Sequence, residues 1–206
     1  MKSVWIYAPA PRWEIWFDAL TPSLEEAGIE CHKLPSEAGQ GGVYGLKQLL
    51  TETSRWASGM LCLVETNDPR LSDLNRACRA ASLPLLLVSS FDASLQVGPG
   101  VVFGTSPCLA CFEKHNKFLP LDKASASTRT ETANSFAPLP PPDGQLLGEI
   151  IDFIAGAPAS LLRRGYVFRA DSNEGGTRRF RVLKNPTCMV CSVFAEHPTE
   201  STRINT

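Results

Sequence analysis

The stretch Gly98-Pro99-Gly100-Val101-Val102-Phe103-Gly104-Thr105-Ser106-Pro107-Cys108-Leu109-Ala110-Cys111 ends in two cysteines separated by two residues. A second such pair closes Pro186-Thr187-Cys188-Met189-Val190-Cys191, and 76 residues separate the two pairs. We call residues 107–111 the first knuckle and residues 186–191 the second knuckle. Four thiolates in two Cys-x-x-Cys pairs can occupy the corners of a tetrahedron, the closed arrangement of a structural zinc ion. We therefore predict one zinc site with Cys108, Cys111, Cys188 and Cys191 as ligands.

Other interpretations of these cysteines remain open. One pair could be a redox motif on a thioredoxin-like unit, or both pairs could be buried free thiols. A catalytic zinc ion needs an open coordination position, and four cysteines leave none. Each pair lies close behind a proline and encloses only small or apolar residues, which predicts that each knuckle is a tight turn.

Composition excludes several classes of protein. The 206 residues are 43% hydrophobic, and 20 Lys and Arg residues nearly balance 21 Asp and Glu residues. Such a balance indicates a soluble globular chain and gives no sign of nucleic-acid binding. We expect a cytoplasmic protein, because the sequence shows neither a signal peptide nor an apolar run of membrane-spanning length.

The first half of the chain alternates strand and helix patterns. Apolar runs predict strands at Val4–Ala8, Ile29–Leu34, Met60–Val64 and Leu83–Val88. Helical spacing predicts helices at 12–27, with a kink or break at Pro22, at 46–56, and at 72–81, where Ser72 would be the cap. This order predicts an α/β fold, a Rossmann-like, mostly parallel sheet with helices on both faces. Ligands bind such sheets at the C-terminal edge of the strands.

The second half has a different character. Residues 121–144 are rich in Pro, Ser and Thr and predict a crossover linker. A short helix follows at 146–154, and alternating residues at 166–170 and 177–182 predict a β-hairpin. We therefore expect a core at 1–120, a linker at 121–144 and a helix-hairpin unit at 145–206, with the zinc site joining the hairpin to the first sheet.

Several of these segments resemble a known family. Leu63-Val64-Glu65-Thr66-Asn67-Asp68-Pro69, with 75–78 and 83–89, is similar to the central part of ThiF-type adenylating enzymes, the relatives of ubiquitin-activating enzyme. Both knuckles match the structural zinc site of that superfamily. Within it, the chain looks most like the ThiF-like proteins of pathways that form thiazolines and oxazolines in ribosomally made, post-translationally modified peptides (RiPPs). The resemblance covers about residues 60–112 and 145–191.

The resemblance implies a role and partners. It implies a zinc-binding subunit that supports a YcaO-type cyclodehydratase, has a precursor peptide as a further partner, and forms a homodimer or heterodimer. Proteins of this type usually begin with a winged-helix element that grips the leader peptide. Here the chain starts directly at the first strand, so we expect that element to be missing or too diverged to recognise.

The departures from the family bear on catalysis. An ATP-binding ThiF-type enzyme cradles phosphates with a glycine-rich turn after its first strand, whereas this turn reads Ala8-Pro9-Ala10-Pro11-Arg12. Asp68 falls at the position of the superfamily's metal-nucleotide aspartate, although a carboxylate at a strand end is more often a turn or helix cap. Arg70 and Arg76 are candidates for its arginine. We expect a non-catalytic scaffold that binds neither ATP nor magnesium; the alternatives are a divergent adenylating enzyme and a dimeric zinc-clipped interaction module.

Other chemically notable residues carry weaker signals. We expect Cys31, Cys62 and Cys78 to be core residues, and His32, His115 and His197 to lie on the surface or behind the metal ligands. Alternation on the hairpin places Arg179 and Arg181 on one face and Phe180 and Val182 on the other. The local basic cluster is either a solvated sheet face or a docking face for an acidic leader peptide or partner; it consists of Arg163, Arg164, Arg169, Arg178, Arg179 and Arg181.

Overall fold

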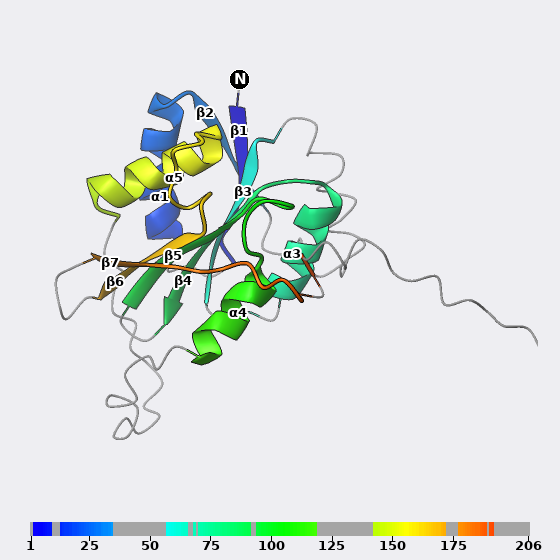
Figure 1. Ribbon diagram of the computed structural model, residues 1–206. Helices are drawn as coiled ribbons and strands as arrows, with labels where there is room; N and C mark the ends of the chain where they lie inside the picture. Colours follow the sequence, from blue (N-terminus) through cyan, green and yellow to red (C-terminus); the bar gives the residue numbers. More distant parts are fainter. Residues whose placement is uncertain are drawn as a thin grey trace, which may run out of the picture.

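The computed structural model describes residues 2–9, 13–34, 57–65, 68, 70–91, 94–118, 142–171, 177–188 and 190–191. Within these residues seven strands form one sheet in the order β2-β1-β3-β4-β5-β6-β7 (Figure 1). The strands are β1 (Lys2–Tyr7), β2 (Ile29–Lys33), β3 (Gly59–Glu65), β4 (Leu85–Phe91), β5 (Ser94–Val101), β6 (Tyr166–Asp171) and β7 (Thr177–Arg181). The helices described are α1 (Glu14–Glu26), α3 (Leu71–Ala80), α4 (Leu109–Phe118) and α5 (Gly144–Ala155).

The first four strands form the parallel half of the sheet. β1 pairs in parallel with β2 and β3, and β3 pairs in parallel with β4. Residues Met60–Val64 of β3 are completely buried, as expected for a strand covered on both faces. The Rossmann-like α/β core predicted from the sequence is therefore confirmed.

The other three strands extend the same sheet with antiparallel pairing. β5 returns along β4, β6 pairs with β5 through Val97 and Phe168, and β7 pairs with β6. The predicted hairpin is thus present, but it continues the first sheet instead of standing apart from it. Residues 119–141, which contain most of the predicted linker, lie outside the described residues, so the three-part division of the chain stays a prediction.

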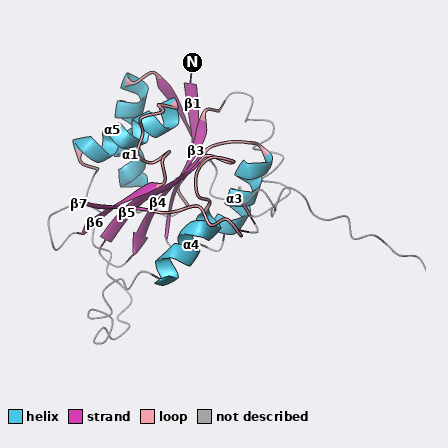
Figure 2. Cartoon of the chain, in the orientation of Figure 1, coloured by secondary structure: helices cyan, strands magenta, loops and turns pink. Residues whose placement is uncertain are grey.

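Helices cover both faces of the sheet (Figure 2). On one face, α1 and α5 pack in a core that contains Trp16, Leu20 and Phe153. On the other face, α3 and the first turn of α4 pack in a second core that also contains Cys62, Cys78 and three of the four knuckle cysteines, with Cys191 against it. The metal-ligand candidates therefore belong to the α3 and α4 side of the sheet.

Local sequence signals explain where the helices begin and end. α1 is a single helix with Pro22 inside it. α5 begins after Asp143, whose carboxylate accepts a hydrogen bond from the Leu146 N–H, and ends at Gly156 with a φ of 79°. The prediction that Ser72 caps α3 is wrong. The helix begins at Leu71, and Ser72 lies within its first turn. The helix predicted at 46–56 lies outside the described residues.

Gly100 lets α5 and the segment after it approach β5 closely. A Cβ atom at this position would lie 2.5 Å from Cε2 of Phe153 and 2.8 Å from the Leu162 carbonyl oxygen. Such distances leave no room for a methyl group, so packing of the core requires a glycine at position 100. No helix in the described part of the chain has the length and apolar content needed to cross a membrane.

Candidate metal centre

The first knuckle lies in the connection between β5 and α4. After β5 the chain turns through residues 102–106, and this turn is held by the Val102 N–H, which donates to Ser106 Oγ at 2.6 Å. Cys108 directly precedes α4, and Cys111 lies in its first turn, where the Phe112 N–H bonds to the Cys108 carbonyl at 3.1 Å. The expected tight turn is therefore wrong for this knuckle, because its second cysteine lies in a helix.

The second knuckle is carried past α4 by the chain that leaves β7 (Figure 1). Asn185 organises it: its side-chain oxygen accepts hydrogen bonds from the N–H and the hydroxyl of Thr187, both at 3.0 Å. Its carbonyl accepts a further bond from the Cys188 N–H at 3.0 Å. Sequence analysis passed over Asn185, although Asn-Pro-Thr is a recognisable turn signal.

The four knuckle sulfurs form one compact cluster. All four ligand atoms lie within 4.8 Å of one another. The Sγ–Sγ distances are 3.9 Å for Cys108–Cys111, 3.6 Å for Cys108–Cys188 and 3.4 Å for Cys111–Cys191. A tetrahedral ion with metal–sulfur bonds of about 2.3 Å separates its sulfurs by about 3.8 Å. The two pairs therefore meet at the spacing that one metal ion requires, and none of these cysteines forms a disulfide.

The surroundings fit a closed structural site. Cys108, Cys111 and Cys188 are buried and Cys191 is half-buried. Backbone N–H groups approach two sulfurs, from Asn185 to Cys111 Sγ and from Val190 to Cys188 Sγ, each at 3.4 Å. Such donors stabilise thiolates around a bound cation.

The thiols of the cluster differ in acidity when no cation is bound. Burial raises the pKa of the Cys108 thiol well above its ordinary value and raises that of Cys191 to about 11. Burial also opposes ionisation of Cys188, but hydrogen bonds from the backbone of Val190 and Cys191 and from neighbouring thiols lower its pKa to about 7. One thiolate is therefore readily available at neutral pH, and a bound cation would favour ionisation of the others.

The remaining cysteines behave as core residues or edge residues. Cys62 and Cys78 are fully buried, and burial raises the pKa of Cys78 to about 12. Cys31, on β2, is only half-buried, with a pKa that burial raises to about 11. In the part of the chain that the structure describes, no other group of three or more Cys, His, Asp or Glu residues is close enough to hold a metal.

Asp68 lies near the C-terminal end of β3, and its carboxylate faces Arg70. Oδ1 accepts bonds from the Arg70 N–H at 2.9 Å and from Nε at 3.0 Å, and Oδ2 accepts one from a terminal guanidinium nitrogen at 2.9 Å. Arg70 also lies over the ring of Tyr7. Arg76 instead pairs with Asp73 on α3. Residues 10–12 of the turn after β1 lie outside the described residues.

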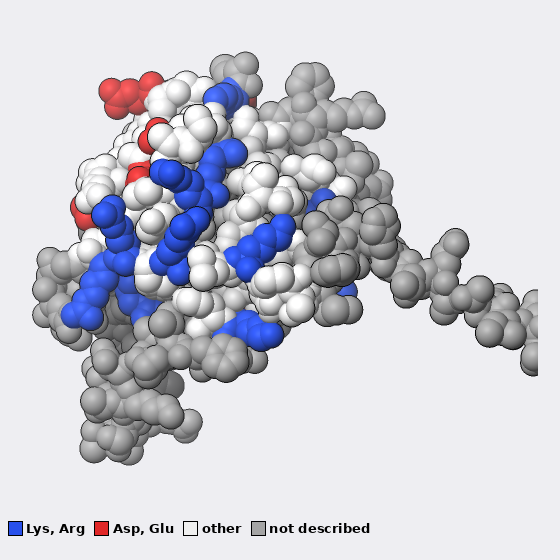
Figure 3. All heavy atoms as spheres, viewed as in Figure 1, with Lys and Arg blue, Asp and Glu red and all other residues white. Residues whose placement is uncertain are grey.

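Among the described residues, no histidine belongs to the four-sulfur cluster. His32 stacks on Trp5 and His115 stacks on Phe180, whereas His197 is outside the described residues. Phe180 on β7 and Val182 just after it pack with Val167 and Phe112, whereas Arg179 and Arg181 lie on the opposite face. Figure 3 shows Lys and Arg side chains gathered on one part of this surface, with Asp and Glu toward another side of the view.

Comparison with known proteins finds similar folds among solved structures but no match of sequence family. No protein-family model and no curated protein matches the chain. Among solved structures, the heterocyclase TruD matches with a TM-score of 0.58 and 20% identity, over 93% of this chain and 27% of that chain. A heterocyclase in complex with substrate and cofactor matches with a TM-score of 0.59 and 18% identity, over 93% of this chain and 25% of that chain.

A third match is a crystal structure of E. coli MccB with selenomethionine MccA. Its TM-score is 0.53 and its identity 15%, over 93% of this chain and 66% of that chain. At these identities the likeness shows a shared fold. The chain spans about a quarter of the length of the two heterocyclase chains.

Proposed function

We propose that the chain is a non-catalytic, zinc-stabilised, ThiF-like scaffold in a RiPP pathway, where it supports a YcaO-type cyclodehydratase that forms azolines. The observation that carries this proposal is the four-sulfur cluster, which closes a fold shared with heterocyclase structures. The matching region makes up about a quarter of those heterocyclase chains, which fits a scaffolding part of a larger peptide-modifying assembly.

Zinc is the metal that the donor set favours. Four thiolates at tetrahedral spacing in a buried position suit Zn²⁺, which has no redox chemistry and needs no open site in a structural role. A redox role for either pair is less well supported, because each pair's sulfurs approach those of the other pair and most of the cluster is buried.

Three features support a role without catalysis at this chain. The sulfur set leaves a bound zinc no position for substrate or water. The turn after β1 has no glycine, and two of its residues are prolines without an N–H for a phosphate. The Asp68 carboxylate is engaged at both oxygens by Arg70.

The proposal is tested by reconstitution with candidate partners. The metal-loaded chain is co-expressed with a YcaO-type protein from its source organism, and co-purification is measured together with water loss from a candidate precursor peptide by mass spectrometry. We expect a stable complex, and ring formation that depends on both proteins. Strong ATP–pyrophosphate exchange by the purified chain alone would contradict the scaffold role. Light scattering of the same samples tests the homodimer or heterodimer included in the proposal.

A divergent adenylating enzyme is the second candidate, and one observation favours it. Tyr7 Oη, at the C-terminal end of β1, and Asn75 Oδ1, on α3, are buried polar atoms without a hydrogen-bond partner among the described residues. Unpaired buried polar atoms near this edge could accept a ligand. Calorimetric titration with magnesium-ATP separates the candidates: micromolar binding that Asp68→Ala abolishes would favour the enzyme, and the absence of any binding that depends on Asp68 would favour the scaffold.

A further inference from the structure

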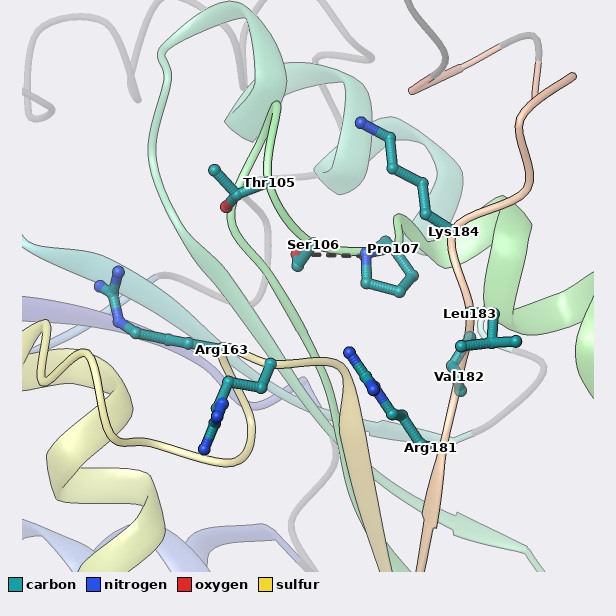
Figure 4. Close-up of a pocket in the computed structure, with 9 residues that line it drawn as sticks. Thr105, Ser106, Pro107, Arg163, Arg181, Val182, Leu183 and Lys184 are labelled. Carbon is teal, nitrogen blue, oxygen red and sulfur yellow. Dashed lines mark hydrogen bonds between the residues drawn. The ribbon is translucent and has the colours of Figure 1, made fainter.

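A small basic cavity lies beside the metal centre, between three segments that are distant in sequence. Its volume is about 200 Å³, and its walls come from residues 105–107 of the turn after β5, residues 163–164 of the 161–165 loop, and residues 181–184 at and after the end of β7. Figure 4 shows Arg181 extending toward Pro107, with Arg163 coming from the 161–165 loop and Lys184 from the segment after β7. The lining includes four cations and two hydroxyl residues: Arg163, Arg164, Arg181, Lys184, Thr105 and Ser106.

Neutral groups hold three of these cations in place. Arg163 Nε donates to the Phe153 carbonyl at 3.0 Å, and its guanidinium lies 5.3 Å from the centre of the Phe153 ring. The Arg181 guanidinium lies 5.8 Å from the centre of the Tyr166 ring. Lys184 Nζ donates to the Gly104 carbonyl at 3.0 Å. Ring faces and carbonyls orient these side chains without cancelling their charge.

No carboxylate of the described residues forms an ion pair with any of the four cations. The ion pairs found there use His32, Lys33, Arg70 and Arg76 instead. Partial burial lowers the pKa of Arg163, as expected for a cation without a nearby counter-charge. Because these cations lack a carboxylate partner among the described residues, an anion in the cavity would supply the missing counter-charge.

The backbone is adapted to bring the cavity walls together. Gly165 has a φ of 83°, and a Cβ atom there would lie 2.9 Å from the Val182 carbonyl oxygen and 3.1 Å from Cδ of Pro107. The Val182 N–H also donates to the Gly165 carbonyl at 2.8 Å. Gly165 thus allows the three walls to pack closely against one another, so the cavity is defined by backbone contacts of the fold.

We propose that this cavity binds the phosphoryl group of a small molecule, either free phosphate or the terminal phosphate of a nucleotide. A phosphoryl group places up to two negative charges and at least three acceptor oxygens within a volume this small. Guanidinium groups match such oxygens with paired donors. A single carboxylate would leave most of the positive charge uncompensated. The residues that line this site include neither Asp68 nor any residue of β1, so the proposal stands apart from both candidate functions above.

The test is calorimetric titration of the full metal-loaded chain at low ionic strength, with inorganic phosphate, with ADP and with a glutamate-rich peptide in separate runs. The two key variants are Arg181→Glu and Arg179→Glu. Both residues are exposed and lie on the same face of β7, but only Arg181 lines the cavity. The control therefore makes the same charge change two residues away, and thermal melts verify that both variants fold.

We expect phosphate binding that Arg181→Glu weakens at least tenfold and Arg179→Glu by less than about threefold, because direct charge-assisted hydrogen bonds are lost only in the first. Tighter binding of ADP with the same dependence on Arg181 would identify a nucleotide as the source of the phosphoryl group. The proposal is overturned if neither phosphate nor ADP binds at millimolar concentration, if both variants weaken binding equally, or if only the acidic peptide binds.

Discussion

Removing one sulfur from the cluster is the most direct test of the metal centre. In Cys188→Ala, three thiols remain, and the metal that joins the two knuckles loses a ligand. When this weakened three-cysteine site loses its metal, the 76 residues between the knuckles form a loop that is no longer closed. Closing a loop of this length in the unfolded chain is worth about 4.5 kcal/mol by the chain-entropy relation for cross-links. For a domain of this size, such a loss lowers the melting temperature by roughly 10 °C.

The matched control is Cys78→Ala. Cys78 is also a buried thiol in the same core, with its sulfur 3.3 Å from Met60 Sδ, but it lies outside the cluster. Its removal leaves a small cavity that costs roughly 1 kcal/mol and leaves metal binding intact.

Circular dichroism melts and metal quantification per chain distinguish the two variants. We expect one metal per chain in the native protein and in Cys78→Ala, and a strongly reduced content with the larger drop in melting temperature in Cys188→Ala. Equal melting temperatures for Cys188→Ala and Cys78→Ala, or a full metal content in Cys188→Ala, would refute the assignment of the cluster as a metal site that stabilises the fold.

Three further outcomes follow from the described contacts. In urea titrations, Gly100→Ala should lower the free energy of unfolding by roughly 1–3 kcal/mol, because its methyl group would overlap Phe153. In the same titrations, Gly148→Ala should raise it by roughly 0.5–1 kcal/mol, because Gly148 is an exposed glycine inside a helix. Burial raises the pKa of Tyr7 from 10.0 to about 12. The unfolded chain therefore loses this proton first as pH rises, stability falls from about pH 10 to about pH 12, and urea midpoints should show a shallower fall for Tyr7→Phe. Acidification should release the metal, because protons compete for the thiolates; dialysis at about pH 5 should leave less metal than dialysis at neutral pH, and equal retention would contradict thiolate ligation.

The parts of the fold that could be predicted from the sequence are those written in local patterns. The strand runs at 4–8 and 60–64 are continuous and apolar because both faces of the sheet are covered, and their short length between turn residues identifies such segments. The paired cysteines were visible for a different reason: ligand chemistry demands a fixed residue type at a fixed spacing, whatever the fold around it.

The features that sequence analysis missed depend on contacts between distant segments. The register that joins Val97 to Phe168 places the hairpin in the first sheet, and no local pattern encodes that pairing. The start of α4 was missed because Leu109 and Ala110 read as spacer residues between the two cysteines. The helix is stabilised by packing of Phe112 against Val167 and Phe180, which lie far away in the sequence. Lys184 had no visible role in the basic cluster, since its partner Gly104 lies 80 residues earlier.

The metal centre and the basic cavity depend on the same two stretches of backbone. The 102–107 turn leads directly to Cys108, and the segment after β7 runs from Arg181 through Lys184 to Asn185, whose N–H contacts Cys111 Sγ. A metal bound by both knuckles would therefore fix the separation of the two walls that present Pro107 and Arg181. A structural ion without any catalytic step can in this way set the geometry of a neighbouring anion site.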